Sequence, residues 1–153
     1  MSTRPITSPK AVRGLRANSF AALVILLVEY GLGIWVNLYG RLPASDHGAN
    51  LAAGFGRAVA DGPVGLSIHA VLGAALVISA ATALARSILI RRANLIALTS
   101  VALLSVVAAA LSGARFVGNG NNASSMSMAV AAGTAIGAYA LVLLLTGDPA
   151  GQA

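Results

Sequence analysis

Residues 64–85 read VGLSIHAVLGAALVISAATALA and contain no charged side chain. A helix needs about 20 apolar residues to cross the hydrocarbon core of a lipid bilayer. Three other stretches meet this requirement: residues 19–38, interrupted only by Glu29, residues 95–114 and residues 126–145. The sequence therefore predicts an all-α, four-helix transmembrane bundle.

The composition of the 153-residue chain supports this interpretation. Hydrophobic residues make up 58% and charged residues 9%, whereas soluble domains carry roughly 25% charged residues. The absence of Cys and the presence of only two His exclude disulfides, thiolate metal sites and a three-histidine centre. No P-loop or GxSxG motif is present. We expect no enzymatic activity and no resident cofactor, and the sequence leaves a metal undetermined.

The positive charges predict the orientation, because Lys and Arg near the ends of spans stay in the cytoplasm. Seven lie on one side: Arg4, Lys10, Arg13, Arg16, Arg86, Arg91 and Arg92. Three lie on the other: Arg41, Arg57 and Arg115. Both termini should therefore be cytoplasmic, in a multi-pass protein of the bacterial cytoplasmic (inner) membrane.

The positions of the predicted spans divide the chain into three parts. We expect residues 1–17 to form a disordered cytoplasmic tail, residues 18–146 the membrane domain and residues 147–153 a second tail. In the first outer loop, Leu51, Phe55 and Val59 recur at every fourth residue before Gly62 and Pro63. This spacing predicts a short amphipathic helix that covers the mouth of the bundle.

Small residues should mark the faces on which the helices pack. In lipid the hydrophobic effect does not drive helices together, so association depends on close packing of their backbones, which small residues allow. Each span carries such residues, and we assign this role to Gly33, Gly73, Gly133 and Gly137. The last two form a GxxxG motif. It serves either packing within the bundle or a homodimer contact.

Two ionisable residues lie within the predicted spans. Glu29 is about 13 Å from the outer end of its span and His69 about 8 Å, at the helical rise per residue. An acid at that depth must be protonated, paired or beside water. Glu29 and His69 could thus be paired, directly or through water. The alternative is that Glu29 bonds a neighbouring hydroxyl such as that of Ser67 or Ser105 and His69 a backbone carbonyl, with neither residue doing chemistry.

A polar pocket should form around these two residues near the outer mouth. Asn37 and Arg115 are assigned to it with Glu29 and His69, although Arg115 is also suited to reach the outer interface. One alternative is a b-type haem with His69 and Met128 as axial ligands, with Met126 as another candidate for the sixth position.

Two resemblances add expectations. The segment Leu26-Leu27-Val28-Glu29 resembles the first span of small multidrug resistance transporters, which implies a proton-coupled cation site at Glu29. Four further segments, VNLYGRLP at 36–43, HAVLG at 69–73, SGARF at 112–116 and ASSM at 123–126, are similar to a group of small bacterial and archaeal four-span membrane proteins of unassigned function. That likeness implies the topology and no activity.

From the sequence we expect a structural or accessory membrane protein with a polar intramembrane pocket. A haem-binding electron-transfer protein and a proton-coupled small-cation exporter are the alternatives. We expect the protein to lie in the lipid bilayer and to have a larger membrane complex or a second copy of itself as partner. We expect no binding to nucleic acid.

Overall fold

The computed structural model describes residues 9–39, 51–119 and 121–147. They form five helices and no strand: α1 (Pro9–Tyr39), α2 (Leu51–Ala60), α3 (Val64–Ile90), α4 (Ala93–Asn119) and α5 (Asn122–Leu145). All except α2 are long and apolar enough to cross a membrane. The prediction of an all-helical chain with four candidate spans is confirmed.

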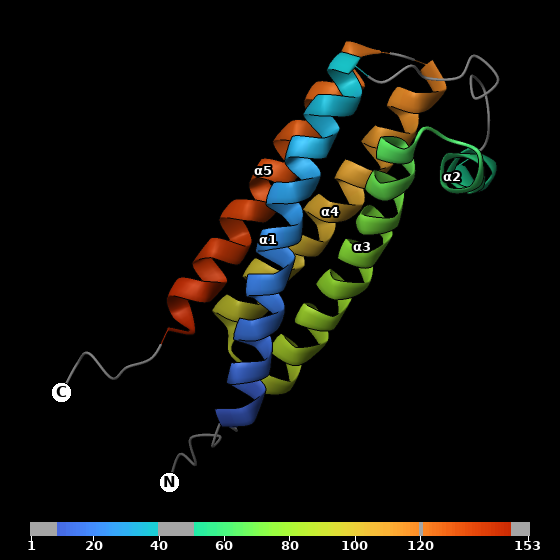
Figure 1. The fold of residues 1–153 in the computed structure, drawn as a ribbon. Helices are drawn as coiled ribbons and strands as arrows, with labels where there is room; N and C mark the ends of the chain where they lie inside the picture. The colour runs from blue at the N-terminus through green and yellow to red at the C-terminus, as the bar shows by residue number, and fades with distance from the viewer. Residues whose placement is uncertain (1–8, 40–50, 120, 148–153) are drawn as a thin grey trace, which may run out of the picture.

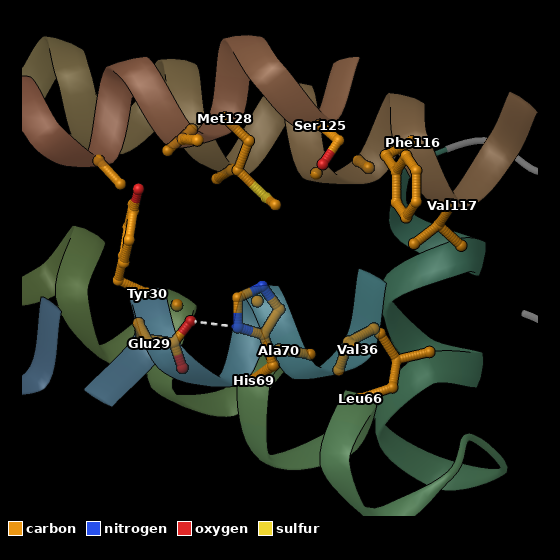
Figure 2. A pocket seen from close by; sticks show the side chains of 18 of the residues that line it. Glu29, Tyr30, Val36, Leu66, His69, Ala70, Phe116, Val117, Ser125 and Met128 are labelled. Carbon is orange, nitrogen blue, oxygen red and sulfur yellow. Dashed lines mark ion pairs between the residues drawn. The ribbon is translucent and has the colours of Figure 1, made fainter. Parts of the chain in front are cut away.

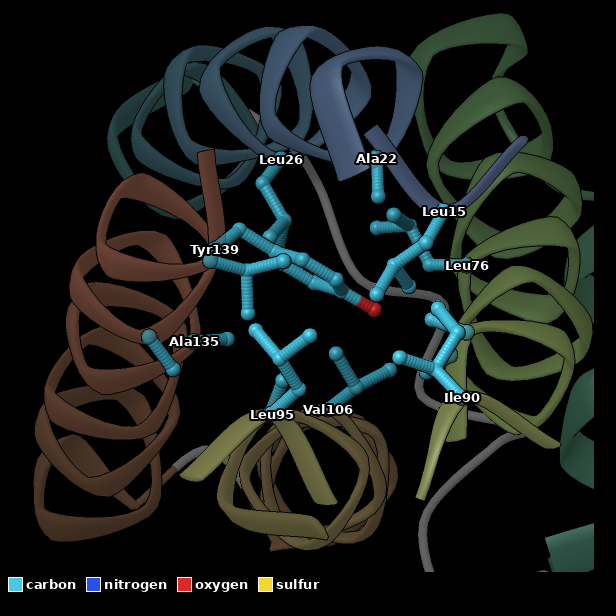
Figure 3. Packing of buried hydrophobic residues seen from close by; sticks show 14 residues of the cluster. Leu15, Ala22, Leu26, Leu76, Ile90, Leu95, Val106, Ala135 and Tyr139 are labelled. Carbon is cyan, nitrogen blue, oxygen red and sulfur yellow. The ribbon is translucent and has the colours of Figure 1, made fainter. Parts of the chain in front are cut away.

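The four long helices run up and down in chain order around a common axis (Figure 1). Viewed along that axis, α1 and α4 lie opposite each other, with α3 and α5 between them (Figure 3). Short connections explain this order, because a link as short as the one between α3 and α4 forces consecutive helices to pack antiparallel. The start of α1 and the end of α5 therefore lie at the same end of the bundle (Figure 1).

Basic side chains gather at that end. Those described are Lys10, Arg13 and Arg16 on α1, with Arg86, Arg91 and Arg92 at the end of α3 and the link that follows. We call this the basic end and the opposite one, which carries α2, the α2 end. Arg91 terminates α3 with a left-handed backbone conformation (φ 58°), and its N–H donates to the carbonyl oxygens of Ser87 and Ile88.

The first helix is longer than the sequence predicts. It begins at Pro9, so residues 9–17, expected in a disordered tail, are helical. Proline is well suited to a first helical turn because its missing N–H would have no partner there. Leu15 is fully buried in the main hydrophobic cluster, and Ala11 and Val12 pack against that cluster. The prediction of disorder, which rested on Pro5 and Pro9, did not take this packing into account. Residues 1–8 and 148–153 of the predicted tails lie outside the described residues.

Helix α2 lies across the bundle instead of along it, and Figure 1 shows it end-on beside the start of α3. Its last turn is held by Ser67 of α3. The Ser67 hydroxyl donates to the carbonyl oxygen of Ala58 at 2.8 Å and also lies 3.3 Å from that of Gly62. A small apolar cluster of Val36, Ala58 and Leu66 completes the contact between α1, α2 and α3.

The main hydrophobic cluster fills the half of the bundle nearer the basic end. Tyr139 is its largest fully buried side chain, and its ring points into the centre of the bundle (Figure 3). Among the described residues, the Tyr139 hydroxyl has no hydrogen-bond partner. Close packing is therefore concentrated in this half, and the other half is hollow.

Candidate functional site in the α2-end half of the bundle

A pocket of about 720 Å³ occupies the α2-end half. All five helices contribute to its wall, which runs from Leu26 and Val106 near the middle of the bundle to Phe55 and Asn122 near the α2 end. Most of its lining is apolar, and its polar side chains are those of Glu29, Tyr30, His69, Asn122 and Ser125. Its volume falls within the range of ordinary small-molecule sites.

Glu29 of α1 and His69 of α3 are the polar centre of this pocket (Figure 2). Nδ1 of His69 lies 2.5 Å from Oε2 of Glu29, so the sequence prediction that these residues meet agrees with the geometry. The two atoms are in close contact, but the contact is not a well-directed hydrogen bond, because Nδ1 is also among the buried polar atoms without a hydrogen-bond partner.

The second carboxylate oxygen of Glu29 has no partner. Glu29 is only 7% exposed, and its Oε1 atom makes no hydrogen bond with any described residue. An unsatisfied buried oxygen costs about 1–3 kcal/mol or more, and a charged one is costlier. The pocket therefore presents an acceptor that nothing in the described chain satisfies.

One of the alternative partners expected for Glu29 is engaged elsewhere. Ser67, one candidate, donates instead to the carbonyl oxygen of Ala58 in α2 and lies close to those of Gly62 and Pro63 in the link before α3. Glu29 therefore contacts His69 of α3 and not the hydroxyl of Ser67.

Met128 of α5 faces the pair across the pocket. Its side chain points toward His69 in Figure 2, and a Cβ placed on Gly33 would lie 3.8 Å from Met128 Cε and 3.6 Å from His69 Cε1. Gly33 thus leaves the space between α1, α3 and α5 in which these side chains meet. A Cβ on Gly113 would lie 3.1 Å from Met128 Sδ, so this glycine also makes room for the thioether.

Not all predicted site residues come together. Gly73 lines the pocket with Gly33, whereas Arg115 is exposed and does not line it. The predicted pocket role of Arg115 is therefore wrong, because its position on α4 directs it to the outside. The side chain of Asn37 lies outside what the structure describes.

Gly133 and Gly137 lie on the exposed surface of α5, with no atom of another helix within 4 Å of where a Cβ would be. Packing between the described helices of one chain is therefore not their role. The buried face of α5 is formed instead by Ala135, Ala138, Tyr139 and Val142. A contact between two copies of the chain stays a prediction.

Two features of the site escaped the sequence interpretation. The first is that the pocket reaches the surface beside α1 and α5. Two of its lining residues are exposed there, Tyr30 by 41% and Met126 by 70%. Trp35 packs on Gly65, where a Cβ would lie 2.4 Å from the indole ring. The glycine is visible in the sequence, but nothing there identifies the aromatic ring that requires it.

Among the described residues, no cluster of three His, Cys, Asp or Glu is arranged to hold a metal ion. Glu29 and His69 are the ionisable pair available for chemistry inside the pocket.

Comparison with known proteins gives no family assignment, because no family model, curated protein or solved structure matches the chain. The four apolar helices agree with the topology implied by the segments at 36–43, 69–73, 112–116 and 123–126. Function must therefore be argued from the pocket.

Proposed function

We propose that this chain is a small, non-enzymatic binding protein of the bacterial cytoplasmic membrane, in which it serves as an accessory component. Its ligand is a small, largely apolar molecule held between the four spans. The observation that carries this proposal is the pocket of about 720 Å³ with an aliphatic wall and one buried carboxylate. A purely structural bundle has no need of this space, because packed side chains stabilise helix association in lipid.

The proposed orientation places the basic end in the cytoplasm and the α2 end, with the pocket, toward the outer half of the membrane. The support is the six described basic residues at the basic end, because positive charge is retained on the cytoplasmic side. In this arrangement α2 lies at the outer interface.

The test is binding of an uncharged aromatic probe, triphenylphosphine oxide, to the full chain in lipid nanodiscs. Gly33→Leu would fill the pocket, since a Cβ there already reaches His69 and Met128 at contact distance. Gly31→Leu is the matched control, because Gly31 is exposed, does not line the pocket and has nothing within 4 Å of its Cβ position. Saturable binding by the wild type and Gly31→Leu, lost in Gly33→Leu, would support the proposal. Equal uptake by all three, or no more than in empty nanodiscs, would refute it.

A b-type haem protein is the second candidate, and one observation favours it. The carboxylate of Glu29 engages Nδ1 of His69, while the other ring nitrogen faces the side of the pocket from which Met128 projects (Figure 2). Histidines that bind metals commonly have their second nitrogen held by a carboxylate in this way. His69 and Met128 would hold the haem iron, and the haem would supply one-electron chemistry.

The visible absorption spectrum separates the two candidates. A Soret band that disappears in His69→Ala would establish haem and replace the first proposal. A colourless protein after expression with ample haem would exclude the second candidate and leave the first unchanged.

A further inference from the structure

We infer that the basic end holds an anionic phospholipid in a groove between α1 and α5, with its phosphate at Arg13 and Arg16 and an acyl chain over Phe20. The groove has a volume of about 530 Å³ and is lined by Arg13, Arg16, Ala17 and Phe20 of α1 and Leu143 of α5. It shares no lining residue with the pocket in the α2-end half. The inference therefore goes beyond the proposed function and does not depend on it.

The residues that α1 contributes to the groove lie on one face of that helix. Positions 13, 16, 17 and 20 are separated by three and four residues, so their side chains project on the same side. Arg13 and Arg16 are exposed, and Phe20 is 60% exposed although it is a large apolar side chain. Leu143, which is partly buried, brings α5 to this face. The groove is thus charged near the start of α1 and apolar one to two turns further along.

This change from charged to apolar surface falls where the hydrocarbon core of a bilayer would begin. Residues 17–28 of α1 carry no charge, and the helix continues to Tyr39. At about 1.5 Å per residue, the part of α1 from residue 17 to residue 39 spans about 34 Å, close to the roughly 30 Å of the core. The guanidinium groups of Arg13 and Arg16 then lie at the level of the phosphates, and Phe20 lies beside the acyl chains.

The positive charge at this end is not balanced by acids of the described chain. Six basic residues lie there, whereas the two described acids, Glu29 and Asp61, lie in the pocket and at the α2 end. The other two acids of the chain lie outside the described residues. Arg86 of α3 adds to the charge beside the groove, because its guanidinium lies against Gly14, where a Cβ would collide with Nη1. Arginines of two helices therefore converge on the start of α1.

These features together favour a phospholipid over a soluble anion. A guanidinium binds a phosphate through paired, charge-assisted hydrogen bonds, and basic pockets between spans bind the headgroups of anionic lipids. Free phosphate would satisfy the arginines alone, whereas a phosphate that carries acyl chains also covers Phe20 and Leu143. A zwitterionic lipid fits less well, because its own cationic group would lie among six basic side chains.

A tryptophan placed in the groove measures which lipid lies there. Trp35 is the only tryptophan of the chain, so Phe20→Trp combined with Trp35→Phe gives a reporter for the groove alone. Val101→Trp in the same background is the control reporter, because Val101 is 43% exposed and lies on α4, opposite α1 in the bundle (Figure 3). Brominated lipids quench the emission of a neighbouring tryptophan. Quenching by brominated phosphatidylglycerol and by brominated phosphatidylcholine, compared in mixed bilayers, therefore gives the relative affinity for the anionic lipid at each reporter.

The groove reporter should prefer phosphatidylglycerol by at least about fivefold, because each basic residue near the membrane surface attracts anionic lipid. The control reporter should show nearly equal affinity for the two lipids. A preference at the groove no greater than at the control would overturn the inference and leave the proposed function untouched.

Variants separate a lipid site from the general effect of positive charge. Arg13→Gln combined with Arg16→Gln should reduce the preference of the groove reporter to that of the control. Arg91→Gln combined with Arg92→Gln removes the same charge from the same end, but neither residue lines the groove, so the preference should be retained. Equal losses in the two double variants would show that the preference follows total charge and would overturn the inference.

Inorganic phosphate distinguishes the lipid from its headgroup chemistry alone. An excess of phosphate should leave the quenching by phosphatidylglycerol the same as in sodium chloride of equal ionic strength, because the acyl chain contributes to binding in the groove. Recovery of emission in phosphate but not in chloride would assign the arginines to a free anion and overturn the lipid assignment.

Discussion

Nδ1 of His69 and Oε2 of Glu29 lie 2.5 Å apart on two different helices, and the second oxygen of Glu29 has no described partner. The pair joins α1 to α3 in the hollow half of the bundle, where few side chains pack. It is therefore both a structural contact and the one acid–imidazole pair among the described residues that line the pocket.

The two residues should be energetically coupled. His69→Leu leaves the carboxylate buried without its partner and should lower stability by about 3 kcal/mol, whereas Glu29→Leu combined with His69→Leu removes both polar groups and should lower it less. Thermal unfolding of the two single variants and the double variant in the same detergent measures this coupling. Single effects that simply add would show that the contact contributes nothing.

Gly65 should not tolerate a side chain. In Gly65→Ala the new Cβ would meet the indole of Trp35, which must then move, at a cost of about 1–3 kcal/mol. Trp35 is the only tryptophan of the chain, so its emission maximum reports the displacement directly. Gly73→Ala, with nothing within 4 Å of the Cβ position, is the matched control and should change neither stability nor emission.

Removing the hydroxyl of Tyr139 should stabilise the bundle. Its oxygen is fully buried without a hydrogen-bond partner among the described residues, and such a group costs about 1–3 kcal/mol. Tyr139→Phe keeps the ring and should raise the unfolding temperature. Tyr30→Phe changes an exposed residue and should leave it constant. A lower unfolding temperature in Tyr139→Phe would reveal a hydrogen bond that the described residues do not provide.

Ser67 should determine how firmly α2 is held. Ser67→Ala removes the 2.8 Å bond to the carbonyl of Ala58, and faster amide hydrogen exchange is expected across residues 51–60 with little change in α4. Ser127→Ala provides the comparison, since that hydroxyl bonds at 2.8 Å to Ala123 within its own helix. Equal exchange of α2 in the two variants would show that the Ser67 contact is not what holds it.

The proposed orientation can be tested by labelling, because the chain contains no native cysteine. Asp61→Cys at the α2 end and Arg92→Cys at the basic end introduce single exposed thiols. In intact cells an impermeant maleimide should label the first at once and the second only after the membrane is permeabilised. The reverse pattern would place the basic end outside.

The sequence was sufficient for the features that depend on composition along a single helix. Uncharged stretches such as residues 64–85 revealed the candidate spans, and the depths of Glu29 and His69 from a common end indicated that they meet. Features that depend on which face of a helix turns inward could not be predicted from the sequence. Small residues on α5 satisfy the same spacing rule on more than one face, and the structure buries Ala135 and Ala138 instead of Gly133 and Gly137.

The predictions for the start of α1 and for the position of Arg115 were wrong for related reasons. Helix α1 extends to Pro9 because Leu15 finds a buried position, and this position depends on residues far away in the sequence. A basic residue near the end of a span looks the same in the sequence whether its side chain faces a pocket or the outside. The sequence therefore could not tell which of the two applies to Arg115.

The contrast between the two halves of the bundle has a mechanical consequence. Around Tyr139, close packing leaves the four long helices little freedom to separate, whereas the opposite half encloses about 720 Å³ of space. We therefore expect the helix ends at the packed half to keep their spacing and those at the hollow half to separate more easily. Occupancy of the pocket would change the spacing of the helix ends beside α2 while the basic end stays still.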